Sequence, residues 1–339
     1  MSKIYDDANG WVNWNYLFPE CRFIMAITGP RQVGKTYGLL KYVLDHNYSF
    51  LYLRRLKSQL DSCITSSDDN PFTALNQTGN YHIEARRKRN TVQFFDISNE
   101  EEPKQIGRGG ALSTLAELRG IYLGDTDVIV FDEFIPMIGE RPIKEEAEGF
   151  YNLLETVNSN RELDGRPPVK VFMLGNANKL MNPYYLYWHF MKTALKMIRG
   201  GQMMYRTPDN RRIMVMLLNS PISARKKETA LYKGAENEGF FQMAIENVFA
   251  TDATTIKPAK LTDCRHIISI GSIGIYQLKS TGEHYCSETV DKSNLIAENE
   301  IGIKIFRARY AGLKLIYLHG FFTFENYDCE LLFREYIGL

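Results

Sequence analysis

The sequence lacks any long apolar run. None of its apolar stretches approaches the roughly 20 residues that a membrane-spanning helix needs. The first residues, Met-Ser-Lys-Ile-Tyr-Asp-Asp, are polar and do not form the apolar core of a signal peptide. The five cysteines include no C-x-x-C pair, which is typical of a protein kept in a reducing compartment. We therefore expect a soluble intracellular protein without a membrane partner.

Strong net charge is also missing. The chain has 41 Lys and Arg against 40 Asp and Glu, so its net charge is only +1. A nearly neutral chain has no overall field to attract nucleic acid, and a nucleic-acid surface would have to be a local patch. The length of 339 residues predicts two domains with a sizeable core.

The most informative stretch is a complete G-x-x-x-x-G-K-[ST] loop. It consists of Gly29, Pro30, Arg31, Gln32, Val33, Gly34, Lys35 and Thr36. An apolar run at residues 23–27 precedes it and a helix-like run at residues 37–44 follows, which is the context of a P-loop. The backbone N–H groups and Lys35 of such a loop bind nucleotide phosphates, and the Thr36 hydroxyl ligates magnesium. The sequence therefore predicts ATP and Mg²⁺ as cofactors.

A second motif lies farther along the chain, where an apolar run at residues 128–131 ends in Asp132 and Glu133. Two carboxylates at the end of a buried strand, downstream of a P-loop, are typical of a P-loop ATPase. Asp132 would hold the magnesium ion through water, and Glu133 would orient and deprotonate the attacking water. A further apolar run ends near Asn176, which would either contact the γ-phosphate and its water or only form a turn.

Local clusters of cations are the candidates for contact with DNA. One cluster lies at the end of the strand predicted at residues 50–55, where α/β proteins place ligands. The other fills the turn of a hairpin predicted at residues 81–97. Both would either grip a phosphate backbone or remain solvated surface charge. The candidate residues are Arg54, Arg55, Lys57, Arg86, Arg87, Lys88 and Arg89.

Alternating strand and helix patterns predict an α/β fold with a central, mostly parallel sheet. The aromatic residues of segment 5–20 would either cap the core or form a wall for an adenine ring. Residues 144–161 have the apolar spacing of an amphipathic helix. Residues 199–233 are rich in Lys and Arg, which is typical of a linker with a basic face. The boundaries we expect are 1–198 for a P-loop ATPase domain, 199–255 for a basic linker or lid subdomain, and 256–339 for a small C-terminal α/β domain.

Together these motifs resemble the DNA-packaging ATPase of phi29-type tailed phages, a short relative of the large terminases. The resemblance covers nearly all of residues 20–190 and is weaker over residues 265–339. It is carried by the P-loop, by Tyr52-Leu53-Arg54-Arg55-Leu56-Lys57, by Val130-Phe131-Asp132-Glu133-Phe134, by Glu155-Thr156-Val157 with Asn160-Arg161-Glu162, and by Asn176-Ala177 with Asn182-Pro183-Tyr184.

The resemblance implies an ATP-driven translocase of double-stranded DNA. Such a protein would act as a homo-oligomeric ring, which we expect to be a pentamer, on the portal of an empty capsid. It would be found in the host cytoplasm and only transiently at the portal vertex. A structural RNA is a further partner that the sequence leaves open.

The resemblance also assigns residues outside the P-loop. Arg161 and Arg119 match basic positions that act across the subunit interface in the family, and Arg141 and Arg166 come next in line for that role. The C-terminal domain would be RNase H-like. Because residues 265–278 contain no Asp or Glu, we expect that domain to bind rather than to cut DNA with metal ions.

Two other functions fit a P-loop chain. A small-molecule kinase would also have an α/β fold, but Glu133 and the basic tail argue against it. A nucleotide-gated binding module without catalysis is disfavoured by the intact Lys35, Asp132 and Glu133. ATP hydrolysis stimulated by DNA would separate these alternatives.

Overall fold

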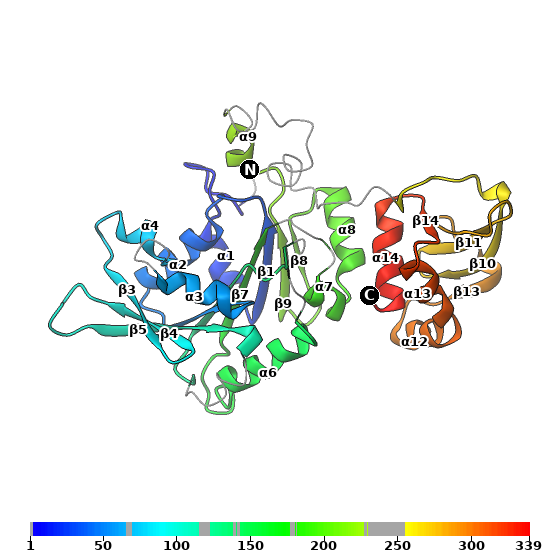
Figure 1. Cartoon of the computed structure of the whole chain (residues 1–339). Helices are drawn as coiled ribbons and strands as arrows, with labels where there is room; N and C mark the ends of the chain where they lie inside the picture. The colour runs from blue at the N-terminus through cyan, green and yellow to red at the C-terminus, as the bar shows by residue number, and fades with distance from the viewer. Residues whose placement is uncertain are drawn as a thin grey trace. The chain divides into compact units, whose positions relative to one another are not determined.

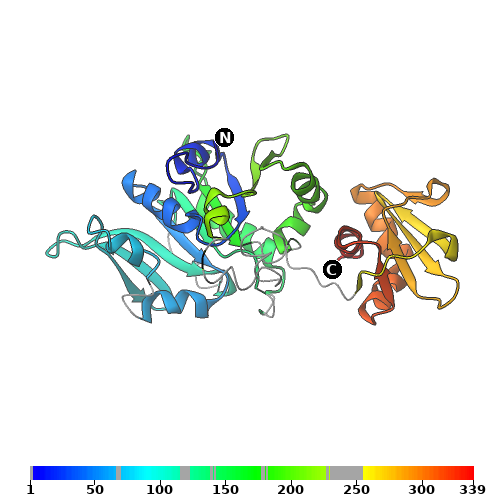
Figure 2. The same ribbon diagram turned by 90° about the horizontal axis from the view of Figure 1, so that it is seen from above.

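The computed structural model describes residues 3–65, 70–114, 123–137, 140, 143–176, 180, 182–226, 229 and 255–339. The chain divides into two compact units (Figure 1, Figure 2). One unit is formed by residues 1–187 and 196–250, and the other by residues 188–195 and 251–339. Among the described residues, no helix is long and apolar enough to cross a membrane.

The larger unit is built on a nine-stranded sheet with the order β3-β4-β5-β2-β6-β7-β1-β9-β8. The run β5-β2-β6-β7-β1-β9 is parallel throughout, whereas β3, β4 and β8 pair antiparallel at the two edges. Parallel strands are buried on both faces, which explains the continuous apolar runs of β1, β2, β6 and β7. The strands are β1 (Ile24–Gly29), β2 (Phe50–Arg54), β3 (Ile83–Lys88), β4 (Thr91–Asp96), β5 (Lys104–Ala111), β6 (Val128–Asp132), β7 (Lys170–Asn176), β8 (Met204–Arg206) and β9 (Arg212–Met216).

Helices cover both faces of this sheet, and β6 shows how its side chains divide between them. Val128 and Val130 belong to one apolar cluster with Leu39 of the P-loop helix. Phe131 points to the other face, where it stacks on Phe150 of the predicted amphipathic helix. The helices up to residue 226 are α1 (Trp14–Glu20), α2 (Lys35–Asp45), α3 (Lys57–Thr65), α4 (Thr73–Asn76), α6 (Glu146–Asn158), α7 (Pro183–Tyr187), α8 (Met191–Gly200) and α9 (Pro221–Lys226).

Part of the aromatic segment before the P-loop caps the core, which was one of the two roles expected for it. Trp14 and Phe18 of α1 are buried, and Phe18 stacks on Phe172 of β7, so this part caps the core. Trp11 remains 39% exposed and lies in edge-on contact with Tyr37, just after the P-loop.

In the segment predicted to be a basic linker, the structure differs from the prediction. Residues 204–216 form β8 and β9, and β9 pairs in parallel with the P-loop strand β1. The apolar residues of β9 are buried there, and the arginines around them had obscured a short strand in the sequence. Residues 221–226 of the predicted linker form α9, and residues 227–254, apart from Thr229, lie outside the described residues.

The C-terminal unit is a small α/β domain, as predicted. Its sheet has the order β13-β10-β11-β12-β14, with β10, β11 and β12 antiparallel and the two outer strands parallel to their neighbours. Phe322 and Phe324 of the sheet pack on Phe333 of the last helix, which forms the core. The elements are β10 (Cys264–Ile270), β11 (Ile273–Leu278), β12 (His284–Ser287), β13 (Leu295–Ile296), α12 (Glu300–Arg309), α13 (Ala311–Leu318), β14 (Phe322–Phe324) and α14 (Tyr327–Ile337).

Candidate nucleotide-binding site

The P-loop joins β1 to α2 and has the backbone that its glycines predict. Gly34 has φ of +83°, a left-handed conformation that glycine adopts without strain. A Cβ atom at Gly34 would lie 2.9 Å from the Trp11 ring, so the aromatic segment packs directly on the loop. The Trp14 indole N–H also donates to the Gly34 carbonyl at 3.2 Å. The aromatic segment therefore fixes the loop from outside.

A cleft of about 300 Å³ lies beside this loop, at the carboxyl ends of β1, β6 and β7. That edge is where parallel sheets bind their ligands. The cleft is lined by Arg31, Gln32, Gly34, Lys35, Thr36, Tyr37, Asp132, Glu133, Leu174, Gly175 and Asn176. The structure thus brings together the P-loop, the two carboxylates and the asparagine that the sequence placed on three separate strands.

Lys35 is buried at the bottom of the cleft. Its ammonium group donates to the carbonyls of Gly29 and Pro30 and to the Asn176 amide oxygen at 3.1 Å. Burial lowers the pKa of Lys35 to about 7, against the opposing effect of the Asp132 carboxylate. The phosphates of a nucleotide would stabilise the charged form of this lysine.

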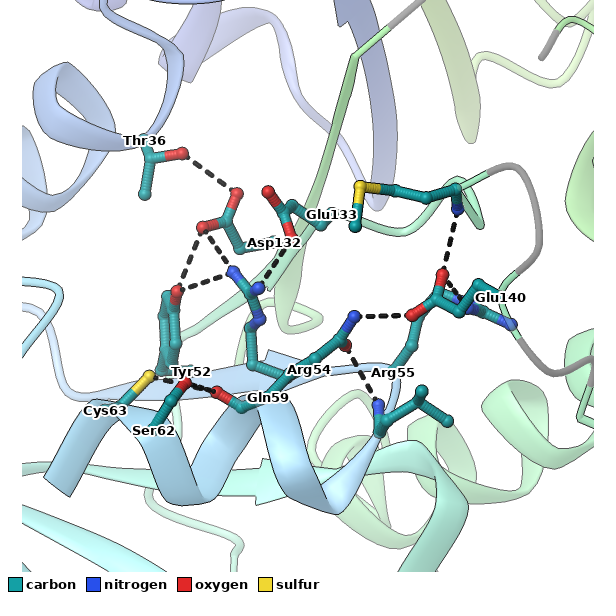
Figure 3. A network of polar contacts seen from close by, with 12 residues as sticks. Thr36, Tyr52, Arg54, Arg55, Gln59, Ser62, Cys63, Asp132, Glu133 and Glu140 are labelled. Carbon is teal, nitrogen blue, oxygen red and sulfur yellow. Dashed lines mark hydrogen bonds and ion pairs between the residues drawn. The ribbon is translucent and has the colours of Figure 1, made fainter. Parts of the chain in front are cut away.

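Thr36 and Asp132 meet from opposite sides of the cleft. The Thr36 hydroxyl donates to Asp132 Oδ1 at 2.9 Å, and the Tyr52 hydroxyl donates to Asp132 Oδ2 at 2.9 Å (Figure 3). Burial and the Asp132 carboxylate raise the pKa of Tyr52, so its hydroxyl is a neutral donor. A hydroxyl and a carboxylate are hard oxygen ligands, and magnesium binds few such groups while keeping several waters. The pair therefore fits a magnesium ion.

Glu133 follows directly and has an unusual backbone. Its φ of +54° is left-handed, which costs of order 1 kcal/mol or more for a residue with a side chain. Arg54 reaches from the end of β2 and donates to Glu133 Oε2 at 2.6 Å and to Asp132 Oδ2 at 3.2 Å (Figure 3). Burial disfavours the guanidinium charge, but Tyr52 and the two carboxylates raise the pKa of Arg54 overall. Arg54 thereby fixes the direction of the Glu133 carboxylate.

Lys226 is a residue of the site that the sequence did not single out. It ends α9, and its ammonium group donates to the Arg31 carbonyl at 2.9 Å and to Gln32 Oε1 at 2.7 Å, both on the P-loop. A second hollow of about 500 Å³ opens beside it, lined by Ala8, Asn9, Trp11, Ile222, Arg225, Lys226 and Thr229. The only sequence signal for Lys226 was the basic composition of residues 199–233. Its contact with the P-loop joins residues almost 200 positions apart, so no local motif could indicate it.

Two of the predicted DNA contacts are wrong. Arg54 pairs with Asp132 and Glu133, and Arg55 is buried between Glu140 and Glu146, so neither side chain is available to DNA. The other candidates lie together. Lys57 at the start of α3 donates to Asn90 in the turn of the β3–β4 hairpin at 2.7 Å. The hairpin strands continue through Lys88 and Thr91, so Arg86, Arg87 and Lys88 lie on a strand and Arg89 in a two-residue turn, all exposed.

The whole chain, rather than the cleft alone, matches a known family. The match is to the family described as Podovirus DNA encapsidation protein (Gp16) and extends over residues 6–335. The chain belongs to this family. A DNA packaging protein of Bacillus phage phi29 is 22% identical to this Gp16 protein over 326 residues, which are 90% of each chain. The DNA packaging protein of Bacillus phage PZA has the same identity and coverage.

Solved structures share the fold of this Gp16 protein. The Phi-28 gp11 DNA packaging motor has a TM-score of 0.56 and 18% identity, over 98% of this chain and 99% of that chain. The bacteriophage Phi-29 viral genome packaging motor assembly has the same TM-score and identity, over 96% and 99%. The fold of a packaging motor subunit therefore extends over both units.

The arginines expected to act across a subunit interface differ in their burial in this chain. Arg161 was expected to reach outward, but it is 4% exposed and pairs with Asp127 at 3.2 Å. It also donates to the carbonyls of Gly124, Thr126 and Pro167. These partners lie just before β6 and β7, whereas the cleft lies at the other ends of these two strands. Arg119 and Arg141 lie outside the described residues, and Arg166 is partly exposed.

Proposed function

We propose that this Gp16 protein is an ATP-driven translocase that packages double-stranded viral DNA through the portal of a procapsid. The observation that carries the proposal is the single cleft that unites Lys35, Thr36, Asp132 and Glu133. These are the parts a P-loop protein needs to hold a nucleotide and to activate water. Membership of the encapsidation family supports DNA as the cargo.

The chain's own groups would divide the work of binding. The N–H groups of the P-loop and the Lys35 ammonium would hold the phosphates, with Asn176 beside Lys35 at the γ-phosphate end. Thr36 and Asp132 would hold magnesium, which neutralises the developing phosphate charge. The hollow beside Trp11 and α9 adjoins the P-loop and provides an aromatic ring for the adenine base.

Hydrolysis would be the work of Glu133. Its carboxylate lines the cleft, and Arg54 holds one of its oxygens, so the other can accept a proton from the attacking water. This arrangement does not favour a small-molecule kinase, which has no use for a water-activating carboxylate. It also does not favour a nucleotide-gated binding module, because nucleotide binding alone does not require a water-activating carboxylate.

DNA would contact the basic surface of the β3–β4 hairpin, which we define as Lys57, Arg86, Arg87, Lys88 and Arg89. The hairpin forms the end of the large sheet in both views (Figure 1, Figure 2). The four cations of the hairpin itself are exposed, and Arg86 and Arg87 pair with the exposed or half-exposed acids Glu84 and Asp61. Phosphates can replace such acids, because surface ion pairs are weak.

The protein would act as a ring, expected to be a pentamer, in the host cytoplasm and at the portal vertex. The relatives' solved structures are described as packaging motors, which supports assembly with a portal and DNA. Arg119 stays our first candidate for an arginine that completes a neighbour's site, with Arg141 and Arg166 next. The C-terminal unit would bind rather than cut DNA, because β10 and β11 carry no Asp or Glu.

The decisive experiment measures ATP hydrolysis with and without double-stranded DNA. Glu133→Gln should retain ATP binding and lose turnover by about 100-fold or more, because the amide cannot accept a proton. Lys35→Ala should weaken ATP binding itself. The matched control is Glu148→Gln, an exposed glutamate on α6, which should hydrolyse ATP at the parent rate. Parent-rate hydrolysis by Glu133→Gln would remove the assigned base.

A further inference from the structure

Arg55 is a fully buried cation that the proposed mechanism does not use. Its side chain has 0% exposure, and it donates to both oxygens of Glu146, from Nε and from the terminal nitrogen, each at 2.7 Å. A third N–H donates to Glu140 Oε2 at 2.6 Å (Figure 3). Burying a guanidinium is costly unless carboxylates compensate it, and a paired fork of this kind gives both charge and direction.

The acids that hold Arg55 are themselves held by other elements. Glu140 also accepts from the Gln59 side chain of α3 at 2.6 Å and from the backbone N–H of Met137 at 2.9 Å. Glu146, in the first turn of α6, also accepts from the Tyr184 hydroxyl of α7 at 3.1 Å. Arg55 is thus the centre of a network that fixes the chain after β6 to α3, α6 and α7.

Arg54 and Arg55 are consecutive, and their side chains bind different acids at the end of β2 (Figure 3). Arg54 binds Glu133, the first residue after β6, and Arg55 binds Glu140 and then Glu146 farther along. The chain that starts with the proposed base is therefore anchored at three of its glutamates by two adjacent arginines. A shift of the Arg55 network would move the chain that carries Glu133.

The backbone conformation of Glu133 requires support of this kind from its surroundings. A left-handed conformation at a residue with a side chain persists only where the surroundings impose it. One backbone contact nearby, Phe134 N–H to the Leu174 carbonyl at 3.2 Å, holds the chain on the β7 side. On the other side, the contacts of Met137 and Glu140 with the network are what prevents it from relaxing.

We propose that Arg55 is a positioning residue for ATP hydrolysis, which acts through Glu140 and Glu146 to hold Glu133 in its strained, water-facing conformation. This inference rests on the proposed function, because Glu133 is the base only there. Arg55 touches neither the P-loop nor the cleft, so its effect falls on the catalytic step rather than on nucleotide binding.

The test replaces Glu140 by Gln in the full-length protein. This variant keeps the size of the side chain and leaves Arg55 paired with Glu146, so folding is preserved. We expect kcat to fall by about 10- to 100-fold, the cost of a small displacement of a catalytic group, while KM for ATP and the affinity for a non-hydrolysable ATP analogue stay within about twofold. Exchange of the Phe134 backbone amide should become faster, since the chain after β6 is released.

The matched control is Glu20→Gln, which weakens an Arg–Glu pair of the same unit, with Arg206 at 2.5 Å, away from the cleft. It should leave kcat and the Phe134 amide unchanged. Arg55→Lys keeps the charge but loses the fork, so it should lower kcat as well. Adding Glu140→Gln to Arg55→Lys should then have less than its full effect, because the two changes remove one shared contact.

The outcomes separate the two proposals. A Glu140→Gln variant with the parent kcat, in a protein that hydrolyses ATP and is inactivated by Glu133→Gln, overturns the positioning role and leaves the proposed function standing. An equal loss of nucleotide affinity and kcat also overturns it, since the P-loop would then be the part disturbed. If the parent protein does not hydrolyse ATP, or Glu133→Gln does so at the parent rate, the proposed function is the part that fails.

Discussion

The end of β2 and the β3–β4 hairpin are both rich in arginine, and the fold uses the two clusters in opposite ways. Arg54 and Arg55 turn inward to four acids, with side-chain exposures of 15% and 0%. Arg86 and Arg87 have exposures of 42% and 50% and pair with single acids at the surface. If our proposals hold, the same residue type would organise catalysis in one place and offer charge to DNA in the other. What decides between the two is the number and burial of the acids nearby.

Breaking the inward cluster should have the largest effect. Arg54→Ala should lower ATP hydrolysis by about 100-fold or more, because Glu133 loses its orienting partner and Asp132 loses a counter-ion. ATP binding should persist, since the P-loop is intact, and DNA affinity should not change. Steady-state hydrolysis and DNA binding measured on the same variant check this. Arg54→Lys should recover only part of the loss, because a point charge cannot serve both carboxylates.

The opposite pattern, weaker DNA binding with normal hydrolysis, would return Arg54 to the DNA surface and erase the contrast between the two clusters. This outcome would also require the ion pairs with Asp132 and Glu133 to open in solution.

The sequence was sufficient to predict which residues line the cleft, but not which residues Arg54 and Arg55 contact. The distance along the chain between contacting residues explains both results. The P-loop is eight consecutive residues, and Asp132 and Glu133 are adjacent, so each motif is local. Arg54 finds Glu133 across 79 residues, and Arg55 finds its partners across 85 and 91. No spacing indicates such pairs. From the sequence alone, therefore, arginines at the end of a buried strand cannot be told apart from arginines at the end of an exposed strand.

The other differences have a similar origin. Strand β9 was missed because its partner β1 lies far earlier in the chain, and the basic residues around it favoured a linker. The hairpin was found, but its turn was placed too early. Exposed arginines can occupy strand positions as readily as turn positions, and only Arg89, with φ of +57°, has turn geometry.

Removing the outward cluster should have the next largest effect. Replacing Arg86, Arg87, Lys88 and Arg89 together by Gln should weaken binding to double-stranded DNA by about tenfold or more, equally for all sequences. The dependence of affinity on salt should also become less steep, because fewer counterions are released. ATP hydrolysis without DNA should be unchanged. Titrations at several salt concentrations measure both quantities.

The matched control for this surface is Arg211→Gln, set against Arg89→Gln alone. Arg211 is an exposed arginine in the connection between β8 and β9, at the other edge of the same sheet. If both single variants weaken DNA binding equally, the β3–β4 hairpin has no special role and general positive charge accounts for the binding.

Arg161 sharpens the comparison from a third position, because it is buried like Arg55 but lies away from the cleft. Arg161→Met should lower the free energy of unfolding by about 2 kcal/mol, since the carbonyls of Gly124, Thr126 and Pro167 lose their donor. Denaturant unfolding checks this, and ATP hydrolysis should be nearly normal.

The competing role of Arg161 has its own test. Mixing Arg161→Ala subunits with Glu133→Gln subunits would restore hydrolysis at mixed interfaces if Arg161 served a neighbouring site. We expect no recovery for Arg161, and the same mixture made with Arg119→Ala is the one we expect to recover activity.

The smallest effect should come from a cation that can lose its charge. His189 belongs to the C-terminal unit and lies 3.5 Å from Glu335 of α14. The hydrogen bond with Glu335 raises the pKa of His189 above 6.5, with burial and Arg307 opposing and Glu300 assisting.

A raised pKa in the folded state means that the contact stabilises fully below pH 6.5 and is lost as pH rises through the folded-state value. Protection of the α14 amides from hydrogen exchange, corrected for intrinsic rates, should therefore decline slightly over that range. His189→Gln should abolish this pH dependence. A parent protein whose α14 protection stays level across the same range would show that even a buried acid adds nothing measurable to an exposed cation, so that the exposure of the cation also decides whether a pair stabilises the fold.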